Sequence, residues 1–465
     1  MLFNIRIENF GRITKADIRI GDFTVFAGKN STGKSYVSKA IYSLFGAMHA
    51  NHLAVVLNPY LLPLSRGLSS LEEYFAEEEI GEMEALVDMR HAVDGLRNIM
   101  RQVSRRNDVD EFDAITEALP EIREFLDKIE SAFPRLEKAI APVAGDPDII
   151  FLEMIGNIEE TVRGLDNIKG FGPDRFVIDG VKYEIEENFL QNFQISQTSH
   201  LRGEMNGHAR LEVDKIGAKV EIGEAIDWTV QKSGLRFMRE YSRVLYLESP
   251  IFWRLKDALD NVEARYRHWR NPITGVPKYY HDMGIQLRQS YPGEPICPDV
   301  LKKLTGDSVL GGRVAVGESG DLFFQSNKGK RYPLRMAATG IANLGMLALL
   351  IEKNLLDQNT LLFVDEPEAH LHPAWQVEMA EALYALSQKG VKVVIATHST
   401  NIIKWVDVKA RKESRQEKGA ENRFALNHFV NGQVEQRDDF FQQIGEIKED
   451  LMEPYQHLFI EGMRE

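Results

Sequence analysis

The chain has almost no cysteine and no long apolar run, and each of these absences excludes a class of protein. Cys297 is the only cysteine among 465 residues, so an intrachain disulfide and a cysteine-based zinc site are excluded. No apolar stretch reaches the roughly 20 residues that cross a bilayer. Arg6 and Glu8 interrupt the first apolar segment, which argues against a signal peptide. We expect a cytoplasmic protein that does not act at a membrane.

The chain also lacks an excess of basic residues. Its formal net charge of −14 at pH 7 argues against a broad basic surface that grips nucleic acid. Hydrophobic residues make up 43% of the chain and charged residues 27%, as in ordinary globular proteins. A chain of 465 residues with this composition is long enough for two or three domains, each with its own core.

A phosphate-binding loop with the pattern GxxxxGKS lies at residues 28–35. The apolar residues 23–27 before it predict a buried strand, and residues 36–44 after it have helical spacing. Strand, loop and helix together suit phosphate, because glycines allow unusual backbone angles and a helix N-terminus attracts anions. We expect Lys34 to bridge the β- and γ-phosphates of ATP and Ser35 to bind Mg²⁺. The predicted nucleotide contacts are Gly28, Asn30, Ser31, Thr32, Gly33, Lys34 and Ser35.

A second candidate segment lies near the other end of the chain, where the apolar residues 361–364 end on Asp365 and Glu366. Two adjacent carboxylates at a strand end are rarely structural, because burying both charges is costly without a cation. We expect Asp365 to hold Mg²⁺ through water and Glu366 to polarise the water that attacks the γ-phosphate. Both must reach the nucleotide held by Lys34. We therefore expect the two strands to lie side by side, with the chain between them forming an excursion.

A further apolar run ends on His398 and completes a set of motifs that resembles one family. The set comprises Asn9-Phe10, GKNSTGKS, ATG at 338–340, DEPEAHLHP at 365–373 and ATHS at 396–399. It resembles the ABC-type ATPases that include RecF, the SMC proteins and the OLD-family proteins, and it covers roughly residues 1–50 and 185–435. The DEPEAHLHP form is most similar to ATPases of bacterial anti-phage systems. Chain size and insertion length resemble the AriA subunits of PARIS systems most, and the PtuA subunits of Septu systems next.

The resemblance implies roles for residues beyond the two nucleotide segments. Thr339 and Gly340 would contact the ATP of a neighbouring subunit through a helix N-terminus, although Ile341 replaces the second glycine of the family pattern. His398 would bind the γ-phosphate and act with Glu366 in catalysis. A glutamine at the edge of the inserted lobe would sense Mg²⁺ and the γ-phosphate. We favour Gln194 for this role, while Gln191 and Gln197 also qualify by position.

The same resemblance implies partners. Two subunits would sandwich two ATP molecules head to tail, and the assembly would control a separate effector nuclease of the TOPRIM type, with a phage protein as its trigger. We expect no nuclease site in this chain, because the residues after His398 contain no convincing Asp-x-Asp motif. The alternative is a RecF-type DNA-repair ATPase that clamps DNA.

Direct DNA binding stays open because two basic clusters interrupt the acidic chain. One is a stripe at helical spacing, and the other mixes basic and aromatic residues. A solvated face or a subunit interface is the simpler interpretation of both, and nucleic-acid contact is the functional one. The first cluster is Arg97, Arg101, Arg105 and Arg106, and the second is Arg265, Tyr266, Arg267, His268, Trp269 and Arg270.

The predicted fold is α/β: an ABC-type ATPase head, with a mixed sheet flanked by helices, that is interrupted by a mainly helical insertion. Residues 1–60 form the N-terminal ATPase lobe and residues 61–170 the helical insertion. Residues 171–240 form a β-rich return that holds the glutamine, and residues 241–330 a lid or insert region of uncertain fold. Residues 331–465 form the C-terminal ATPase lobe.

Two local patterns give sharper predictions for the excursion. Pro120, Pro134 and Pro142 interrupt amphipathic stretches, so we expect a bundle of short helices and not a long coiled coil. Asp179-Gly180 lies between alternating residues at 175–185, which predicts a β-hairpin.

Overall fold

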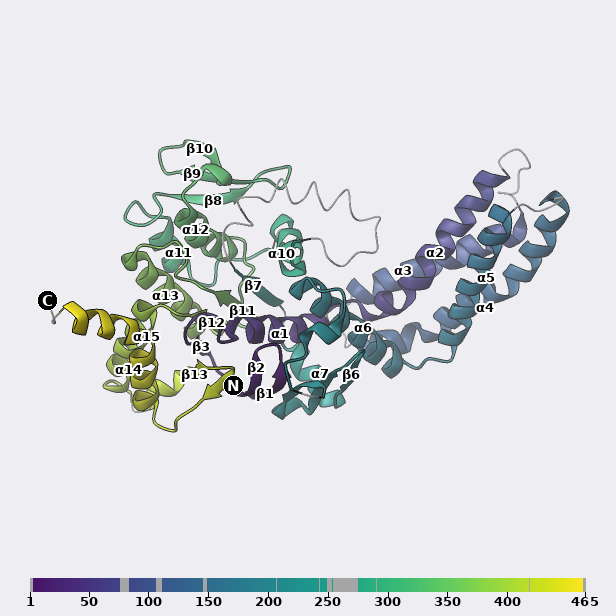
Figure 1. The fold of residues 1–465 in the computed structure, drawn as a ribbon. Helices are drawn as coiled ribbons and strands as arrows, with labels where there is room; N and C mark the ends of the chain where they lie inside the picture. Colours follow the sequence, from purple (N-terminus) through teal and green to yellow (C-terminus); the bar gives the residue numbers. More distant parts are fainter. Residues whose placement is uncertain are drawn as a thin grey trace. The chain divides into compact units, whose positions relative to one another are not determined.

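The computed structural model divides the chain into two compact units, Met1–His49 with Ile185–Glu465, and Ala50–Glu184. The first unit contains a large sheet and the second is helical (Figure 1). The structure describes residues 3–75, 83–105, 111–144, 149–205, 207–241, 243–248, 253, 275–289, 291–417 and 419–462.

The sheet of the first unit has eleven strands within the described residues and is mixed. Its antiparallel part consists, in spatial order, of β6 (Ile226–Thr229), β5 (Ala218–Ile222), β4 (Ala209–Val213), β1 (Phe3–Phe10) and β2 (Ile13–Ile20). The short strand β14 (Gln433–Glu435) then leads to a parallel part: β13 (Phe424–Val430), β3 (Phe23–Ala27), β12 (Lys392–Thr397), β11 (Thr360–Asp365) and β7 (Arg243–Leu247). The predicted mixed α/β fold is confirmed.

The strand order corrects one expectation about the two nucleotide segments. Strands β3 and β11 are not adjacent, because β12 lies between them and pairs with both. The apolar run that ends on His398 is therefore the central strand of the three. Both segments must reach one ligand, but this does not require β3 and β11 to be neighbours. The ends of three consecutive strands can also meet at one ligand.

Helices cover both faces of the parallel strands. The helix α1 (Lys34–Gly46) packs over β7, β11 and β12, and its Tyr42 ring contacts Phe363. Helices α13 (Pro373–Gln388) and α14 (Thr400–Ser414) bring Tyr384 and Trp405 against Phe23. Phe363 pairs with Val394 but Phe23 pairs with Val393, so the two rings point to opposite faces. The β3 strand that precedes the phosphate loop is thus fully enclosed.

The remaining elements of this unit surround the sheet. A small antiparallel sheet of β8 (Gly312–Val316), β9 (Leu322–Ser326) and β10 (Arg331–Pro333) precedes the apolar helix α12 (Thr339–Glu352). The described residues of this unit also form the helices α7 (Lys232–Arg239), α10 (Lys278–Arg288), α11 (Pro298–Thr305) and α15 (Phe440–Gly462).

The second unit is built on helices whose buried residues repeat with the spacing of a coiled coil. These helices are α2 (His52–Tyr74), α3 (Glu84–Arg105), α4 (Glu111–Ala144) and α5 (Ile149–Lys169). On α2, α3 and α4 the buried positions alternate by three and four residues, the pattern that keeps one apolar seam facing a partner. On α2 they are Leu57, Leu61, Leu64, Leu68 and Leu71; on α3, Met89, Val93, Leu96, Met100 and Val103; on α4, Ile122, Leu126, Ile129, Phe133, Leu136 and Ile140.

Two predictions for the excursion are wrong. Pro120, Pro134 and Pro142 all lie inside the single long helix α4, and the buried apolar residues of this helix continue past Pro120 and Pro134. A proline removes one backbone hydrogen bond, but packing along the seam outweighs that loss. Residues 175–185 belong to the helix α6 (Pro173–Phe193) and form no hairpin. A Cβ atom at Gly180 would lie 2.6 Å from the Cβ atom of His52, so this glycine permits close helix contact instead of a turn.

No single helix among the described residues is long and apolar enough to cross a membrane. The consecutive segments Lys34–His49 and His52–Tyr74 meet that test only when they are counted together.

Candidate nucleotide-binding site

Three parallel strands end at one edge of the sheet and bring the sequence-distant motifs together. The phosphate loop follows β3, His398 follows β12, and Asp365 is the last residue of β11. Parallel strands present their carboxyl ends at the same edge, which is where ligands bind in open α/β sheets. The edge therefore combines a phosphate loop, two carboxylates and an imidazole.

The phosphate loop has a backbone that requires glycine at two positions. Gly28 has a φ of 153°, and a Cβ atom there would lie 2.4 Å from the backbone oxygen of Phe429. Gly33 has a φ of 104°, and its Cβ atom would lie 2.4 Å from Cδ1 of Ile13. Ser31 also has a positive φ, of 63°. The loop is therefore held in its cradle shape by its own sequence and by neighbouring strands.

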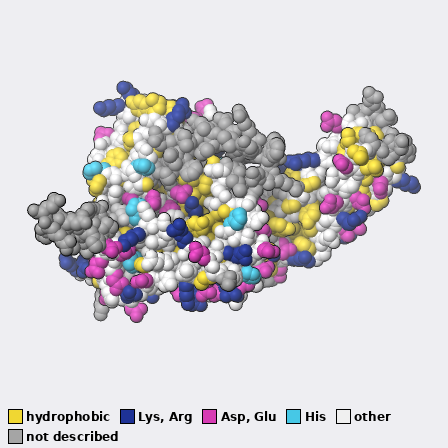
Figure 2. Space-filling model, viewed as in Figure 1, with side chains coloured by type: hydrophobic (Ala, Val, Ile, Leu, Met, Phe, Trp, Pro, Cys, Tyr) yellow, Lys and Arg dark blue, Asp and Glu magenta, His cyan; other side chains and the backbone are white. Residues whose placement is uncertain are grey.

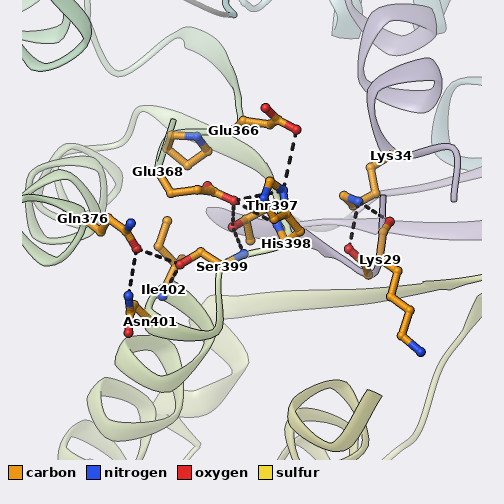
Figure 3. A network of polar contacts seen from close by, with 12 residues as sticks. Lys29, Lys34, Glu366, Glu368, Gln376, Thr397, His398, Ser399, Asn401 and Ile402 are labelled. Carbon is orange, nitrogen blue, oxygen red and sulfur yellow. Dashed lines mark hydrogen bonds and ion pairs between the residues drawn. The ribbon is translucent and has the colours of Figure 1, made fainter. Parts of the chain in front are cut away.

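Lys34 is the most buried cation of this loop. Its Nζ donates to the backbone oxygens of Gly28 and Lys29, both at 2.8 Å (Figure 3). Burial lowers the pKa of Lys34, while the nearby Asp365 and Glu366 carboxylates oppose that change. The ammonium is thus held inside the cradle, where an incoming phosphate would take the place of the two carbonyl contacts.

Asp365 has the donor chemistry that Mg²⁺ prefers. Tyr246 donates its hydroxyl to Oδ2 at 3.1 Å, and the nearby Ser35 hydroxyl favours the charged form of this carboxylate and so opposes the rise of its pKa. Oδ1 is buried and has no hydrogen-bond partner among the described residues. Burial, and next the charge of Glu248, raises the pKa of Asp365 to about 6. An orphaned carboxylate oxygen beside a serine hydroxyl fits a hard cation with oxygen ligands.

Glu366 and His398 lie within reach of each other. The Nδ1 atom of His398 is 3.6 Å from Oε1 of Glu366 and 3.4 Å from Oε1 of Glu368 (Figure 3). Glu366 has a left-handed φ of 51°, and its N–H donates to the backbone oxygen of Ala396 at 2.8 Å. Half of the Glu366 side chain is exposed, whereas Glu368 is buried. Glu366 is therefore the carboxylate of this pair that a water molecule can reach.

The first turn of α12 rests on the loop that follows Glu366. The side chain of Asn343 donates to the backbone oxygens of Pro367, at 3.3 Å, and Ala369, at 3.0 Å. A Cβ atom at Gly340 would lie 2.8 Å from the backbone oxygen of His370. Thr339 is the first residue of the helix. The expected contact of Thr339 and Gly340 with the ATP of a second subunit stays a prediction.

A comparison with known families identifies the kind of protein. A family model described as an AAA ATPase domain matches residues 1–116 and 255–403, which is more than half of the chain. The chain belongs to this AAA ATPase domain family. The ATPase predicted from the motifs is therefore confirmed at the level of the family.

Individual relatives of this AAA ATPase are more distant. The Old nuclease of Escherichia phage P2 is 47% identical over 45 residues, which are 10% of this chain and 8% of that protein. The chain therefore matches only a small part of this relative. Two solved structures are similar to this chain. The Smc head domain with a coiled coil and joint derived from Pyrococcus yayanosii is 12% identical, with a TM-score of 0.32 over 97% of this chain and 99% of that one. The SMC head domain from Thermotoga maritima is 13% identical, with a TM-score of 0.26 over 55% and 84%.

The side chains of all three candidate glutamines of this AAA ATPase form hydrogen bonds within the chain. Gln194 donates to the backbone oxygen of Val276 at 3.1 Å and accepts from the N–H of Gly275 at 2.6 Å. Gln191 donates to Glu187 at 2.6 Å, and Gln197 accepts from the Ser199 hydroxyl at 3.4 Å. Gln194 therefore holds the backbone before α10. Its role in sensing Mg²⁺ stays a prediction.

A polar cluster at the end of β7 was not predicted from the sequence. Glu248 follows this strand, and its Oε1 lies 2.8 Å from Nζ of Lys39 on α1. Its Oε2 accepts the hydroxyl of Tyr279, and the hydroxyl of Tyr246 reaches Asp365. The signal was present, because residues 244–248 read as a core strand that ends on a carboxylate. Only the pairing of β7 with β11 places that carboxylate beside Asp365.

A cavity of about 720 Å³ adjoins the phosphate loop of the AAA ATPase. It is lined by the β1–β2 turn, the loop residues 29–32, residues 203–205 and the β13–β14 turn. Its volume lies within the range of small-molecule sites. Lys29 lies at its wall and forms ion pairs with Asp450 and Glu453 of α15. The cavity therefore lies directly beside the residues that are predicted to bind phosphate.

The histidines of the DEPEAHLHP segment have structural explanations. Nδ1 of His372 accepts a hydrogen bond from the N–H of Ala374 at 3.3 Å and caps the N-terminus of α13. His370 has a left-handed φ of 61° and contributes the backbone oxygen that faces Gly340.

Proposed function

We propose that the chain is the ATP-binding and ATP-hydrolysing subunit of an anti-phage defence complex, in which it acts as sensor and scaffold for a separate nuclease. The observation that carries the catalytic part is the shared edge of β3, β12 and β11. It gathers Lys34, Ser35, Asp365, Glu366 and His398 from both ends of the chain.

Each of these groups has a role in ATP hydrolysis. Ser35 and Asp365, with Gln194, would hold Mg²⁺, which neutralises charge on the β- and γ-phosphates when it is bound. Lys34 binds the same phosphates. The half-exposed Glu366 polarises the attacking water, and His398 orients the γ-phosphate. Thr339 and Gly340 complete the site on a second subunit, so that two chains hold two ATP molecules head to tail.

The defence role rests on motif similarity. The DEPEAHLHP segment resembles ATPases of bacterial anti-phage systems. The size of the chain and the length of its insertion resemble AriA of PARIS first and PtuA of Septu next. The Old nuclease of phage P2 matches a stretch of 45 residues. A TOPRIM-type nuclease as effector and a phage protein as trigger belong to this proposal.

Glu366→Gln tests the proposal, because it should retain ATP binding while hydrolysis falls by at least about a hundredfold. The variant should then accumulate as a dimer with ATP and Mg²⁺. We would co-express it with the product of the neighbouring gene, purify it with ATP and Mg²⁺, and measure mass and composition. A stoichiometric nuclease-like partner supports the defence role, and hydrolysis at the wild-type rate contradicts the role of Glu366. The matched control is Glu381→Gln, which changes a carboxylate that accepts from Trp405 on α14.

A DNA clamp is the second candidate, and one feature of the helical unit favours it. Arg97 and Arg101 line a cavity of about 380 Å³ together with Asn51 and Asn58. On the face in view in Figure 2, however, Lys and Arg side chains are scattered among Asp and Glu. The basic and aromatic cluster at 265–270 lies outside the described residues. Recovery of the ATPase with DNA alone, and DNA binding that weakens steeply with salt, would favour the clamp.

A further inference from the structure

A buried carboxylate outside the predicted catalytic set organises the segment that carries His398. Oε1 of Glu368 accepts the hydroxyl of Thr397 at 2.8 Å and the backbone N–H of His398 at 3.0 Å (Figure 3). Nδ1 of His398 lies 3.4 Å from the same oxygen. Three polar groups of two consecutive residues therefore converge on one oxygen atom.

This arrangement differs from an ordinary buried ion pair. Only 6% of the Glu368 side chain is exposed, and its Oε2 has no hydrogen-bond partner among the described residues. Burying a carboxylate costs free energy unless donors or a cation surround it. The donors in the described part of the chain all come from residues 397 and 398. The stabilisation of Glu368 is thus tied to one conformation of that segment.

The segment is also held from its other side. The N–H of Ser399 donates to the hydroxyl of Thr397 at 3.0 Å, and the Ser399 hydroxyl donates to Oε1 of Gln376 at 2.8 Å. Gln376 in turn donates to the backbone oxygen of Leu371 at 3.1 Å. Residues 397 and 398 are therefore bound to Glu368, near the start of the loop that follows Glu366. Ser399 is connected through Gln376 to Leu371, near the end of the same loop.

We propose that Glu368 is a positioning residue for ATP hydrolysis, which acts through His398. A carboxylate oxygen facing Nδ1 requires a proton on that nitrogen, because a lone pair there would be repelled. The contact at 3.4 Å does not have the geometry of a hydrogen bond, so Glu368 acts on the ring through its charge: it favours the form that carries a proton on Nδ1 and leaves Nε2 as the ring atom available to the γ-phosphate. Glu366 remains free to act on water. This inference rests on the proposed function and adds a residue to its site.

A double-mutant cycle tests this proposal. Glu368→Gln retains an oxygen acceptor but loses the charge that faces Nδ1, and we expect kcat to fall roughly tenfold to a hundredfold, the usual effect of an outer partner. The KM for ATP should change by less than about twofold, since the phosphate loop is untouched. In a His398→Ala background the same substitution should have almost no further effect, because the group through which it acts is gone.

A second readout needs no nucleotide. Hydrogen exchange of the peptide covering residues 392–402 should be faster in Glu368→Ala than in the wild type, because the N–H of His398 loses its acceptor. Thr397→Val should give a smaller increase. Glu381→Ala, a carboxylate substitution on α13, is the matched control and should leave this peptide unchanged.

The outcomes separate this inference from the proposed function. If His398→Ala leaves hydrolysis unchanged, the assignment of the catalytic site fails. If His398→Ala is inactive but the effects of the two substitutions multiply, Glu368 does not act through His398 and this inference alone is overturned. Unchanged exchange at 392–402 in Glu368→Ala would overturn it as well.

Discussion

The nucleotide edge and the helical unit are stabilised in opposite ways. The edge contains non-glycine residues with positive φ at Ser31, Glu366 and His370, and it buries Lys34, Asp365 and Glu368. Among the described residues of 52–184, none has a positive φ. That unit relies on apolar seams with a regular three-and-four spacing.

The difference shows where this chain gives up stability for chemistry. Strained backbone and buried charges each cost free energy and persist only where the surrounding structure fixes them. Both occur together at the edge that we assign to ATP. Substitutions at the edge should therefore change activity more than stability, and substitutions in the seams should do the reverse.

Among substitutions at the nucleotide edge, Lys34→Ala should have the largest effect on ATP binding. We expect ATP affinity to fall by at least about a hundredfold, because the charge-assisted contacts with two phosphates are lost. The free energy of unfolding should change little, since the substitution also removes a buried charge. Fluorescent-nucleotide titration and urea unfolding would measure the two effects. Lys128→Ala, on the surface of α4, is the control, and wild-type affinity in Lys34→Ala would contradict the assignment of the loop.

Leu61→Ala tests the seam of the helical unit. Leu61 is fully buried on α2, and we expect the substitution to lower the free energy of unfolding by about 2–5 kcal/mol. ATP affinity should stay within about twofold of the wild type, because Leu61 lies outside the nucleotide edge. Its neighbour Leu62 is 47% exposed, so Leu62→Ala is a matched control with a loss below about 0.5 kcal/mol. Equal losses in the two variants would show that the seam is not what stabilises α2.

The same contrast explains which parts of the structure could be predicted from the sequence. The phosphate loop and the acidic strand carry their chemistry in short segments, so Lys34, Asp365 and the strand–loop–helix order were readable locally. Glu248 was not readable, because it joins the site only through the pairing of β7 with β11. The interposition of β12 between β3 and β11 is likewise a property of the sheet order.

The predictions of short helices and of a hairpin in the helical unit were wrong for a related reason. Pro134 and the Asp179-Gly180 pair are local signals for a break and a turn, yet both lie within helices. At Pro134 the buried neighbours Phe133 and Leu136 continue the seam. At Gly180 the missing side chain allows α6 to approach His52. In both cases tertiary packing, which no local signal contains, overrides the propensity of the residue.

Asp365→Asn tests the cost of burying a charge at the nucleotide edge, and it should have the smallest effect of the three substitutions. Burial raises the pKa of Asp365 to about 6, above the value of about 3.9 for an exposed carboxyl group. The folded state therefore holds this proton more tightly, and wild-type stability should be lost as pH rises from about 4 through 6. Asparagine has no such proton, so without nucleotide the variant should match the wild type near pH 4 and exceed it by about 1–3 kcal/mol above pH 6.5. Urea midpoints measured across this pH range, with Asp17→Asn at an exposed position as control, would show this difference in stability.

ATP with Mg²⁺ should make the wild type the more stable of the two proteins at pH 7.5, because a cation at Oδ1 stabilises the charged carboxylate. If Asp365→Asn stays the more stable protein under those conditions, the result argues against a metal ligand at this position.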